Sequence, residues 1–263
     1  MAISRKTGKE YLKDFLKIAP LSHALWRSIE ALSFSQVKFK SPVLDVGCGF
    51  GEFAGVVFDR VEVGIDVSAS DLERALKGKK YDKVQWADAR SLPFKNNSFG
   101  TVTSVSVLEH IENAEDVIKE VARVLKKGGL FVFSVPTTQI KKYLLVPSIF
   151  RKIGLSKLGE KYFQLHSRAF KHVYLKPKTW WVEKLQKAGF KIVEAHGTLS
   201  PVALRIHELF LISAFPSQFG KLFFGKRFMM SIGLRSSVLP IFFSRFVKTD
   251  ERSDINMFFV AKK

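Results

Sequence analysis

One run of residues constrains the fold more than any other part of the sequence: VLDVGCGFGEF, at positions 43–53. Its first four residues form a short, mainly apolar stretch that is typical of a buried strand. Three glycines follow at alternate positions, Gly47, Gly49 and Gly51, and glycine permits a tight turn and the close approach of a ligand to the backbone. A turn of this kind at the carboxyl end of a strand is where open α/β sheets bind their ligands.

Strand and helix patterns alternate along much of the chain. We expect strands at residues 43–46, 61–65, 83–86, 101–107, 130–135, 190–195 and 255–261. We expect helices at residues 9–34 with a break at Pro20, and at 52–58, 69–77, 114–125 and 178–188. The helix over 114–125 is predicted to be closed by Lys126–Gly129. This alternation predicts an α/β fold with a doubly wound, mostly parallel sheet.

The charge of the chain is divided unevenly. Its 263 residues hold 43 Lys and Arg against 24 Asp and Glu, a formal net charge of +19. Residues 1–135 contribute +3 of this charge, and residues 136–263 contribute +16 together with 15 of the 25 Phe. A single cysteine, Cys48, excludes a disulfide scaffold and a Cys-based structural zinc site. The basic amino terminus lacks the apolar core of a signal peptide, and no run is long enough to span a bilayer, so we expect a cytoplasmic protein.

The residues around the glycines argue against two common phosphate-bearing ligands. A dinucleotide-binding G-x-G-x-x-G would need glycine where Glu52 stands, and no Gly-Lys-Ser/Thr follows for a P-loop. An acidic first helical turn suits instead a nucleoside that carries positive charge. Asp66, at the end of the second predicted strand, is positioned to accept hydrogen bonds from both ribose hydroxyls. Asp88, after the third strand, is positioned to accept one from an adenine amino group.

Four stretches carry a resemblance to a known family: DVGCGFG, VGIDVS, WADARSLPFKNNSFGTVTSVSVLEHI and LKKGGLFVFSVP. Through them the chain resembles the class I S-adenosylmethionine-dependent methyltransferases, particularly the ubiquinone and menaquinone (methyltransferase type 11) group. The resemblance implies a Rossmann-like sheet of seven strands with the last strand antiparallel, helical insertions that form a lid, and S-adenosylmethionine as cofactor. The cofactor-binding residues expected on this basis are Asp45, Gly47, Cys48, Gly49, Gly51, Asp66, Val67, Asp88, Ala89 and Ser104.

Two residues after the fourth predicted strand are candidates for catalysis, Glu109 and His110. Histidine exchanges a proton near neutral pH, so His110 is the candidate base if the acceptor is a hydroxyl or a phenol. A role in lining the cofactor pocket is the alternative. Some ubiquinone-type members of the family bind a divalent metal through a Glu-x-x-Glu-His run. Ser106 stands here in place of the first carboxylate of that run, so we expect no metal.

We expect four parts in the chain. They are N-terminal helices at residues 1–40, a cofactor-binding core at 41–136, a helical insertion at 137–176, and the end of the sheet at 177–263 with a basic aromatic insertion at 196–253. In similar enzymes the segment that corresponds to 137–176 folds over the acceptor site. The resemblance therefore makes three residues of this segment candidates for contact with the substrate: His166, His172 and Tyr174.

The insertion at 196–253 indicates the kind of acceptor. Residues 196–247 hold nine Phe, six Lys or Arg and one acid, Glu208. Such a segment is typical of helices that lie in a membrane interface, and a lid that packs on the sheet is the alternative. Both interpretations predict a hydrophobic or lipid-like acceptor. The first also predicts an anionic membrane surface, on the cytoplasmic face, as a peripheral partner.

Nucleic-acid methylation is the main alternative function, because a charge of +16 on one half could neutralise phosphates. Against it, no Asn/Asp-Pro-Pro-aromatic motif follows the fourth strand, and the basic residues lie among Phe rather than in a polar groove. A non-catalytic scaffold is a third alternative, which the complete set of acidic residues and glycines disfavours. The sequence predicts an enzyme that transfers a methyl group from S-adenosylmethionine to a hydrophobic small molecule.

Overall fold

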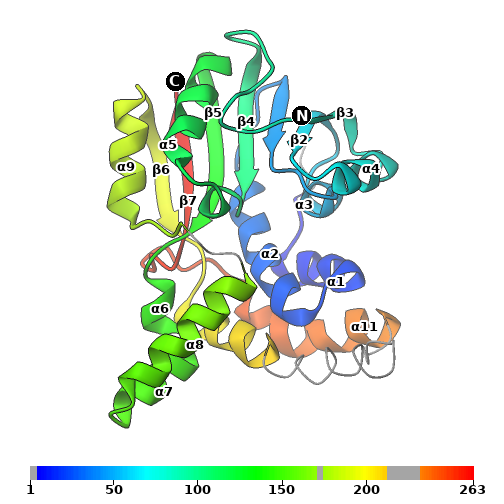
Figure 1. Cartoon of the computed structure of the whole chain (residues 1–263). Helices are drawn as coiled ribbons and strands as arrows, with labels where there is room; N and C mark the ends of the chain where they lie inside the picture. The colour runs from blue at the N-terminus through cyan, green and yellow to red at the C-terminus, as the bar shows by residue number, and fades with distance from the viewer. Residues whose placement is uncertain (1–4, 171–173, 212–231) are drawn as a thin grey trace.

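The computed structural model of the chain describes residues 5–170, 174–211 and 232–263. Its centre is one sheet of seven strands in the order β3-β2-β1-β4-β5-β7-β6 (Figure 1). The strands are β1 (Val43–Val46), β2 (Val61–Asp66), β3 (Tyr81–Trp86), β4 (Phe99–Val105), β5 (Leu125–Pro136), β6 (Lys191–Gly197) and β7 (Asn256–Lys262). Strands β1 to β5 are parallel, and β7 runs antiparallel to both β5 and β6. The predicted Rossmann-like, doubly wound sheet with an antiparallel last strand is confirmed.

Helices cover both faces of the sheet. Those described with defined bounds are α1 (Gly8–Ile18), α2 (Leu21–Phe34), α3 (Glu52–Val57), α4 (Ala69–Lys77), α5 (Ala114–Val124), α6 (Ile140–Tyr143), α7 (Leu145–Lys152), α8 (Ser156–Ala169), α9 (Lys178–Lys187) and α11 (Ile232–Phe243). Residues 201–211 are also helical. One apolar cluster joins the sheet to α5 and α9, and another joins its opposite face to α1, α2, α3 and α4. This two-sided burial is what a parallel sheet requires.

Several predicted boundaries differ from the structure by one or two residues, such as that of β3, which begins at Tyr81 rather than at residue 83. Two differences have a clear reason in the backbone. Lys126–Gly129 was expected to close the helix over 114–125, but α5 ends at Val124 and these residues belong to β5. The pairing of β4 with β5 shifts register there, and Gly128 takes the positive φ (+74°) that the irregular stretch needs. The fourth strand was expected to run to residue 107. It ends at Val105, because Ser106 has a φ of +51°.

A buried carboxylate ties α2 to the sheet. Glu30 is completely buried, and its Oε1 accepts hydrogen bonds from Ser106 Oγ (2.7 Å), Ser134 Oγ (2.7 Å) and Asn256 Nδ2 (3.2 Å). Its Oε2 accepts from Arg27 Nη1 at 2.9 Å. These donors come from α2 itself, from the end of β4, and from β5 and β7. The contacts fix the polar face of α2 against the carboxyl ends of the central strands.

The remaining helices form a group below the sheet as drawn in Figure 1. Glu208, in the helical segment 201–211, is buried and accepts hydrogen bonds from the backbone N–H groups of Leu145 and Val146 at the start of α7. A carboxylate at this position satisfies the unpaired N–H groups of a helix amino terminus. Helix α11 packs against α1. Within the described ranges, each helix is too short or too polar to cross a bilayer.

Replacing the buried carboxylate tests its structural role. Glu30→Gln keeps the size of the side chain but removes its charge. It also replaces one acceptor oxygen by an amide NH₂ group, which cannot accept from the donors that surround it. We expect the free energy of unfolding to fall by about 3 kcal/mol or more, as when one partner of a buried ion pair is lost. Urea denaturation measures it. The exposed Glu73 on α4 supplies the matched control, Glu73→Gln, with an expected change within about 0.5 kcal/mol. Equal stabilities of the two variants would contradict this role of Glu30.

Candidate active site

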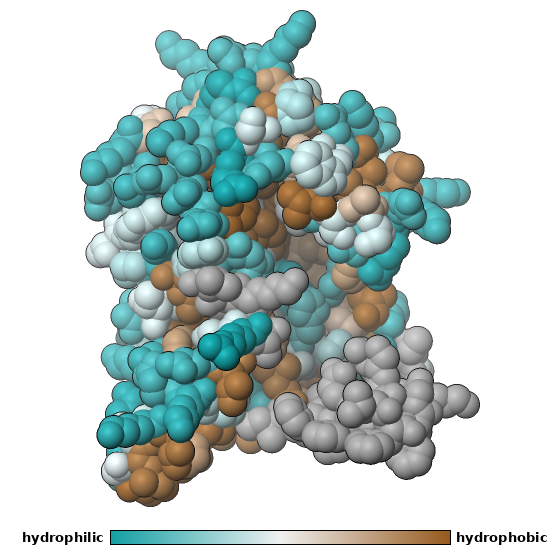
Figure 2. All heavy atoms as spheres, viewed as in Figure 1, coloured by the Kyte–Doolittle hydropathy of each residue, from teal (hydrophilic) through white to brown (hydrophobic). Residues whose placement is uncertain are grey.

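A cleft of about 650 Å³ opens at the carboxyl ends of β1, β2 and β3. Its volume is in the range of small-molecule sites. Figure 2 shows a hollow in the molecular surface near the middle of the molecule, between the sheet and the lower helices. The sequence-predicted site residues that line the cleft are Gly47, Asp66, Val67, Asp88, Ala89, His110 and Tyr174. The strand ends bring most of these residues together, and Tyr174 joins them from the segment between α8 and α9.

The glycine turn is closed against the next strand. The backbone N–H groups of Gly47 and Cys48 both donate to the carbonyl oxygen of Ile65, at 2.9 Å. Gly47 has a φ of +74°, and a Cβ atom there would lie 2.4 Å from the side chain of Val107. No larger residue fits this position, so the turn brings bare backbone to the edge of the cleft.

Asp66 is held at the centre of the cleft wall. Its Oδ2 accepts from the backbone N–H of Gly49 at 2.8 Å, and its Oδ1 accepts from that of Ser68 at 2.9 Å. The carboxylate is therefore oriented before any ligand arrives, with lone pairs left over for further donors.

Asp88 lies farther along the same edge and is bound by its neighbour. The Arg90 guanidinium donates to both carboxylate oxygens, with Nη2 2.6 Å from Oδ2 and Nε 3.1 Å from Oδ1. These hydrogen bonds, assisted by the Arg90 backbone N–H, hold the pKa of Asp88 below its usual value. The Asp88 carboxylate is ionised at neutral pH.

The cleft has an acidic balance. Its described part is lined by one guanidinium, that of Arg90, and by four carboxylates: Asp66, Asp71, Asp88 and Glu112. Such a wall favours a ligand that carries positive charge and disfavours a phosphate. A nucleoside with a cationic sulfur or amine fits both this charge and the oriented lone pairs of Asp66.

Five predicted cofactor residues do not line the cleft: Asp45, Cys48, Gly49, Gly51 and Ser104. Asp45 is buried and accepts from the Tyr81 hydroxyl at 2.6 Å, and burial, with the nearby Asp66 charge, raises the pKa of Asp45 to about 6. Burial and the charges of Asp45 and Asp66 raise the pKa of the Cys48 thiol, which keeps it protonated. Ser104 Oγ donates to the carbonyl of Val46 at 3.0 Å. Asp45 and Ser104 therefore stabilise the strands that carry the turn, whereas Cys48, Gly49 and Gly51 belong to the turn itself.

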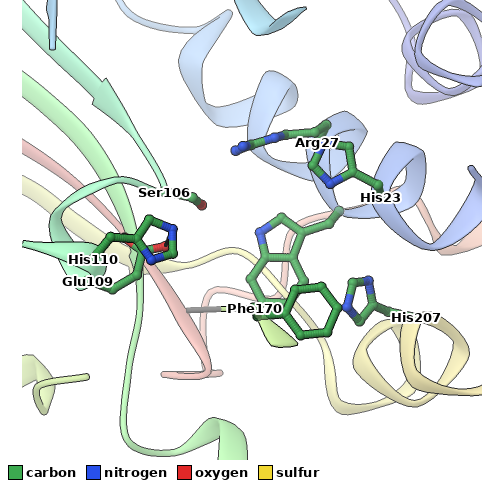
Figure 3. A pocket seen from close by; sticks show the side chains of 8 residues that line it. His23, Arg27, Ser106, Glu109, His110, Phe170 and His207 are labelled. Carbon is green, nitrogen blue, oxygen red and sulfur yellow. Dashed lines mark ion pairs between the residues drawn. The ribbon is translucent and has the colours of Figure 1, made fainter. Parts of the chain in front are cut away.

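A second, smaller pocket of about 110 Å³ adjoins the cleft. Its lining residues are His23, Trp26 and Arg27 from α2, Ser106, Glu109 and His110 after β4, and Phe170 and His207 from the lower helices. Figure 3 shows Ser106, Glu109 and His110 on one side, with Arg27 and His23 facing them from α2. His110 lines both cavities and so lies at the boundary between them.

The contribution of α2 to this pocket was not predicted. Polar residues on an otherwise apolar helix, His23, Arg27 and Glu30, were the only signal available. His23 Nε2 lies 3.1 Å from Glu52 Oε2, at the start of α3. Burial opposes ionisation of Glu52, but the His23 hydrogen bond and nearby positive charge, including that of Arg27 and Arg74, together outweigh burial and lower the pKa of Glu52. The pair links α2 to the helix that follows the glycine turn.

Glu109 is a buried carboxyl group that faces the small pocket. Neither of its oxygens has a hydrogen-bond partner within the described ranges, and His110 Nε2 lies 3.8 Å from Oε1. Burial, reinforced by the charge of Glu30, raises the pKa of Glu109 to about 8. The group is mainly protonated at neutral pH and available as a hydrogen-bond donor.

Two histidines on the lower side are also neutral. Burial lowers the pKa of both His166 and His207 to about 4. His207 Nδ1 lies 2.9 Å from the carbonyl of Ser22. A carbonyl only accepts, so Nδ1 carries the proton and Nε2 is an acceptor. His166 does not line the pocket but packs on Phe170, with 4.8 Å between ring centroids.

Tyr174 and His172 are the remaining residues that were predicted to contact the substrate. Tyr174 lines the large cleft, and its backbone N–H donates to the carbonyl of Glu109 at 3.1 Å. His172 lies outside the described residues. Among the residues that are described, three or more His, Cys, Asp or Glu side chains nowhere gather as a metal would require. Ser106 Oγ donates a hydrogen bond to Glu30 Oε1.

Comparison with known proteins finds a matching family and similar proteins. A family model described as a methyltransferase domain matches residues 44–133. The demethylmenaquinone methyltransferase of Staphylococcus carnosus is 32% identical over 199 residues, which are 69% of this chain and 80% of that protein. The ubiquinone/menaquinone biosynthesis C-methyltransferase of Desulfotalea psychrophila is 35% identical over 125 residues, which are 44% of this chain and 50% of that protein.

A solved structure repeats the fold. The S-adenosylmethionine-dependent methyltransferase of Thermotoga maritima, described as a possible histamine N-methyltransferase, superimposes with a TM-score of 0.54 and 22% identity, over 69% of this chain and 79% of that one. The likeness bears on the fold alone. With a relative 32% identical across four fifths of its length, the chain belongs to the class I S-adenosylmethionine-dependent methyltransferases, and S-adenosylmethionine is its cofactor.

Proposed function

We propose that this methyltransferase acts on a hydrophobic small molecule that loses a proton when it is methylated, and that the reaction takes place at His110. The observation that carries the proposal is that His110 lines both the large cleft and the small pocket. A donor in the first cavity and an acceptor in the second would meet at this side chain. Most of the barrier to methyl transfer is overcome by such positioning.

The large cleft is the proposed cofactor site. Asp66 would accept from the ribose hydroxyls, Asp88 from the adenine amino group, and the backbone of the Gly47–Gly51 turn would lie along the rest of the molecule. The four carboxylates of the wall suit its positive charge. When bound, S-adenosylmethionine supplies a methyl group on a cationic sulfur that departs as a neutral thioether.

The small pocket is the proposed acceptor site. Trp26 and Phe170 give it apolar walls, while three neutral or basic groups supply polar contacts. The protonated carboxyl of Glu109 would donate to an acceptor oxygen, and the free lone pair of His207 Nε2 would accept from one. His110 would take the proton that the acceptor loses. The volume of about 110 Å³ admits the reacting end of an acceptor, with the rest of the molecule lying outside.

Support for a hydrophobic acceptor comes from these walls and from the naming of the Staphylococcus relative as a demethylmenaquinone methyltransferase. We also propose that the enzyme meets the acceptor at an anionic membrane surface. The segment first predicted to lie there, 196–253, is described only in part, because 212–231 lie outside the described residues. Nucleic-acid methylation remains the second candidate, favoured by the charge of +16 on residues 136–263.

The parts of the chain divide these roles in our proposal. The core at residues 41–136 holds the cofactor, and the N-terminal helices at 1–40 supply one wall of the acceptor pocket. The insertion at 137–176 supplies Phe170, and the part from 177 supplies His207.

Transfer of a labelled methyl group tests the proposed acceptor class. The purified enzyme, given S-adenosylmethionine labelled in its methyl group, should move label into the organic phase of a host lipid extract. Total RNA incubated in parallel should stay unlabelled, because a pocket of about 110 Å³ walled by Trp26 and Phe170 suits the reacting end of a hydrophobic small molecule better than a nucleic-acid strand. Label in RNA but not in the lipid extract would overturn the proposed acceptor.

Removal of His110 tests the proposed base. His110→Ala should lower kcat by roughly 10²–10⁴-fold, the usual contribution of a general base, with a cofactor Kd within a few-fold of the wild type. Single-turnover kinetics and calorimetry measure the two effects. His196, on the edge strand β6 and remote from both cavities, gives the control His196→Ala with unchanged kcat. If His110→Ala kept the wild-type kcat, His110 would line the pocket without acting as the base.

A further inference from the structure

The hairpin of α7 and α8 carries a surface that the proposed reaction does not use. We call residues 149–158 the hairpin tip. It projects from the lower helices, away from the sheet (Figure 1). Every residue from 151 to 158 is exposed. The large apolar side chains of the tip that face solvent are Ile149 (48% exposed), Ile153 (60%), Leu155 (46%) and Leu158 (45%).

The charges of the hairpin tip have one sign. It contains Arg151, Lys152 and Lys157 and no acidic residue. Exposed apolar side chains interleaved with basic ones are typical of elements that lie in the interface of an anionic bilayer. Figure 2 shows apolar atoms gathered at the lower left end of the molecule, where the tip lies, with hydrophilic atoms above them.

A basic cavity adjoins the tip. Its volume is about 300 Å³, and Lys141, Lys142 and Arg151 line it together with one acid, Glu160. Lys141 Nζ pairs with Glu160 Oε2 at 2.6 Å, so the acid is already neutralised and Lys142 and Arg151 remain as excess positive charge. The cavity is large enough to admit a phosphate of a lipid headgroup and has the complementary charge, and it lies beside apolar side chains that suit acyl chains.

Helix α8 connects the tip to the acceptor pocket. It begins at Ser156 in the tip and ends before Phe170, which lines the pocket, and its 14 residues extend over about 21 Å. Leu158 and Leu165, seven residues apart and therefore on one side of the helix, are 45% and 65% exposed. They continue the apolar surface from the tip towards the pocket.

A bilayer explains this composition better than a protein partner does. The buried centres of protein interfaces are depleted of lysine, whereas the tip interleaves basic and apolar side chains without a separate apolar centre. Each basic residue close to an anionic surface adds to the attraction. An apolar side chain that enters the acyl boundary needs no complementary shape.

We propose that the hairpin tip docks the enzyme on anionic membranes, with its apolar side chains in the acyl boundary and a headgroup phosphate in the adjoining basic cavity. This inference deepens the proposed function and rests on it for the identity of the acceptor. Docking brings the start of α8 to the bilayer and leaves the acceptor pocket at the other end of that helix.

Vesicle sedimentation of the full chain tests the docking surface. The wild type should sediment with phosphatidylcholine–phosphatidylserine vesicles at low salt and much less with phosphatidylcholine alone. The Arg151→Ser/Lys152→Ser variant should lose roughly thirty-fold in partition coefficient. Ile153→Asp/Leu155→Asp should lose binding at least as strongly. Leu76→Asp, at an apolar side chain 53% exposed on α4, should partition as the wild type does.

Two controls make the outcomes distinct. Calorimetry with S-adenosylhomocysteine should give the wild-type Kd for every variant, because the tip is exposed and remote from the cleft. Equal vesicle binding by the wild type and both tip variants would overturn the inference, as would wild-type binding to RNA without binding to vesicles. Tip-dependent vesicle binding without methyl transfer into lipid would support the docking surface and contradict the proposed acceptor.

Discussion

The buried carboxylate of Glu30 is the contact on which the arrangement of the site depends. A charge without solvent is costly unless donors surround it, and four donors from α2, the end of β4, β5 and β7 do so here. The same contacts fix α2 over the carboxyl ends of the strands. His23, Trp26 and Arg27 then form one wall of the small pocket, opposite Glu109 and His110. Without Glu30, α2 would lose the contacts that hold this wall of the small pocket against the ends of the strands.

The two cavities differ in the charge states of their side chains, and this difference matches their proposed roles. Carboxylates of the large cleft, among them Asp66 and Asp88, are fixed by backbone and Arg90 donors and attract a cation. In the small pocket burial keeps Glu109 protonated and His207 neutral at neutral pH. In the proposed function, a cationic donor on one side and a neutral acceptor on the other would meet at His110, which would take the proton that the acceptor loses.

The parts of the site that local sequence encodes were predictable, and the parts that tertiary packing builds were not. The glycine turn, Asp66, Asp88 and His110 lie at the ends of strands or within five residues after them, and parallel strands bring their carboxyl ends together. The pocket wall from α2 and His207 depends on contacts between residues more than 180 positions apart, such as His207 with Ser22, which no local pattern reveals. Lys126–Gly129 looked like a helix end, but strand pairing with β4 overrode that local preference.

A crystal structure with S-adenosylhomocysteine tests the central claim most directly, namely that cofactor and acceptor meet at His110. The account predicts the ribose against Asp66, the adenine beside Asp88 and Ala89, and the sulfur directed towards His110 and the small pocket. A sulfur that faces away from His110, or a ligand outside the cleft lined by Gly47 and Asp66, would contradict it.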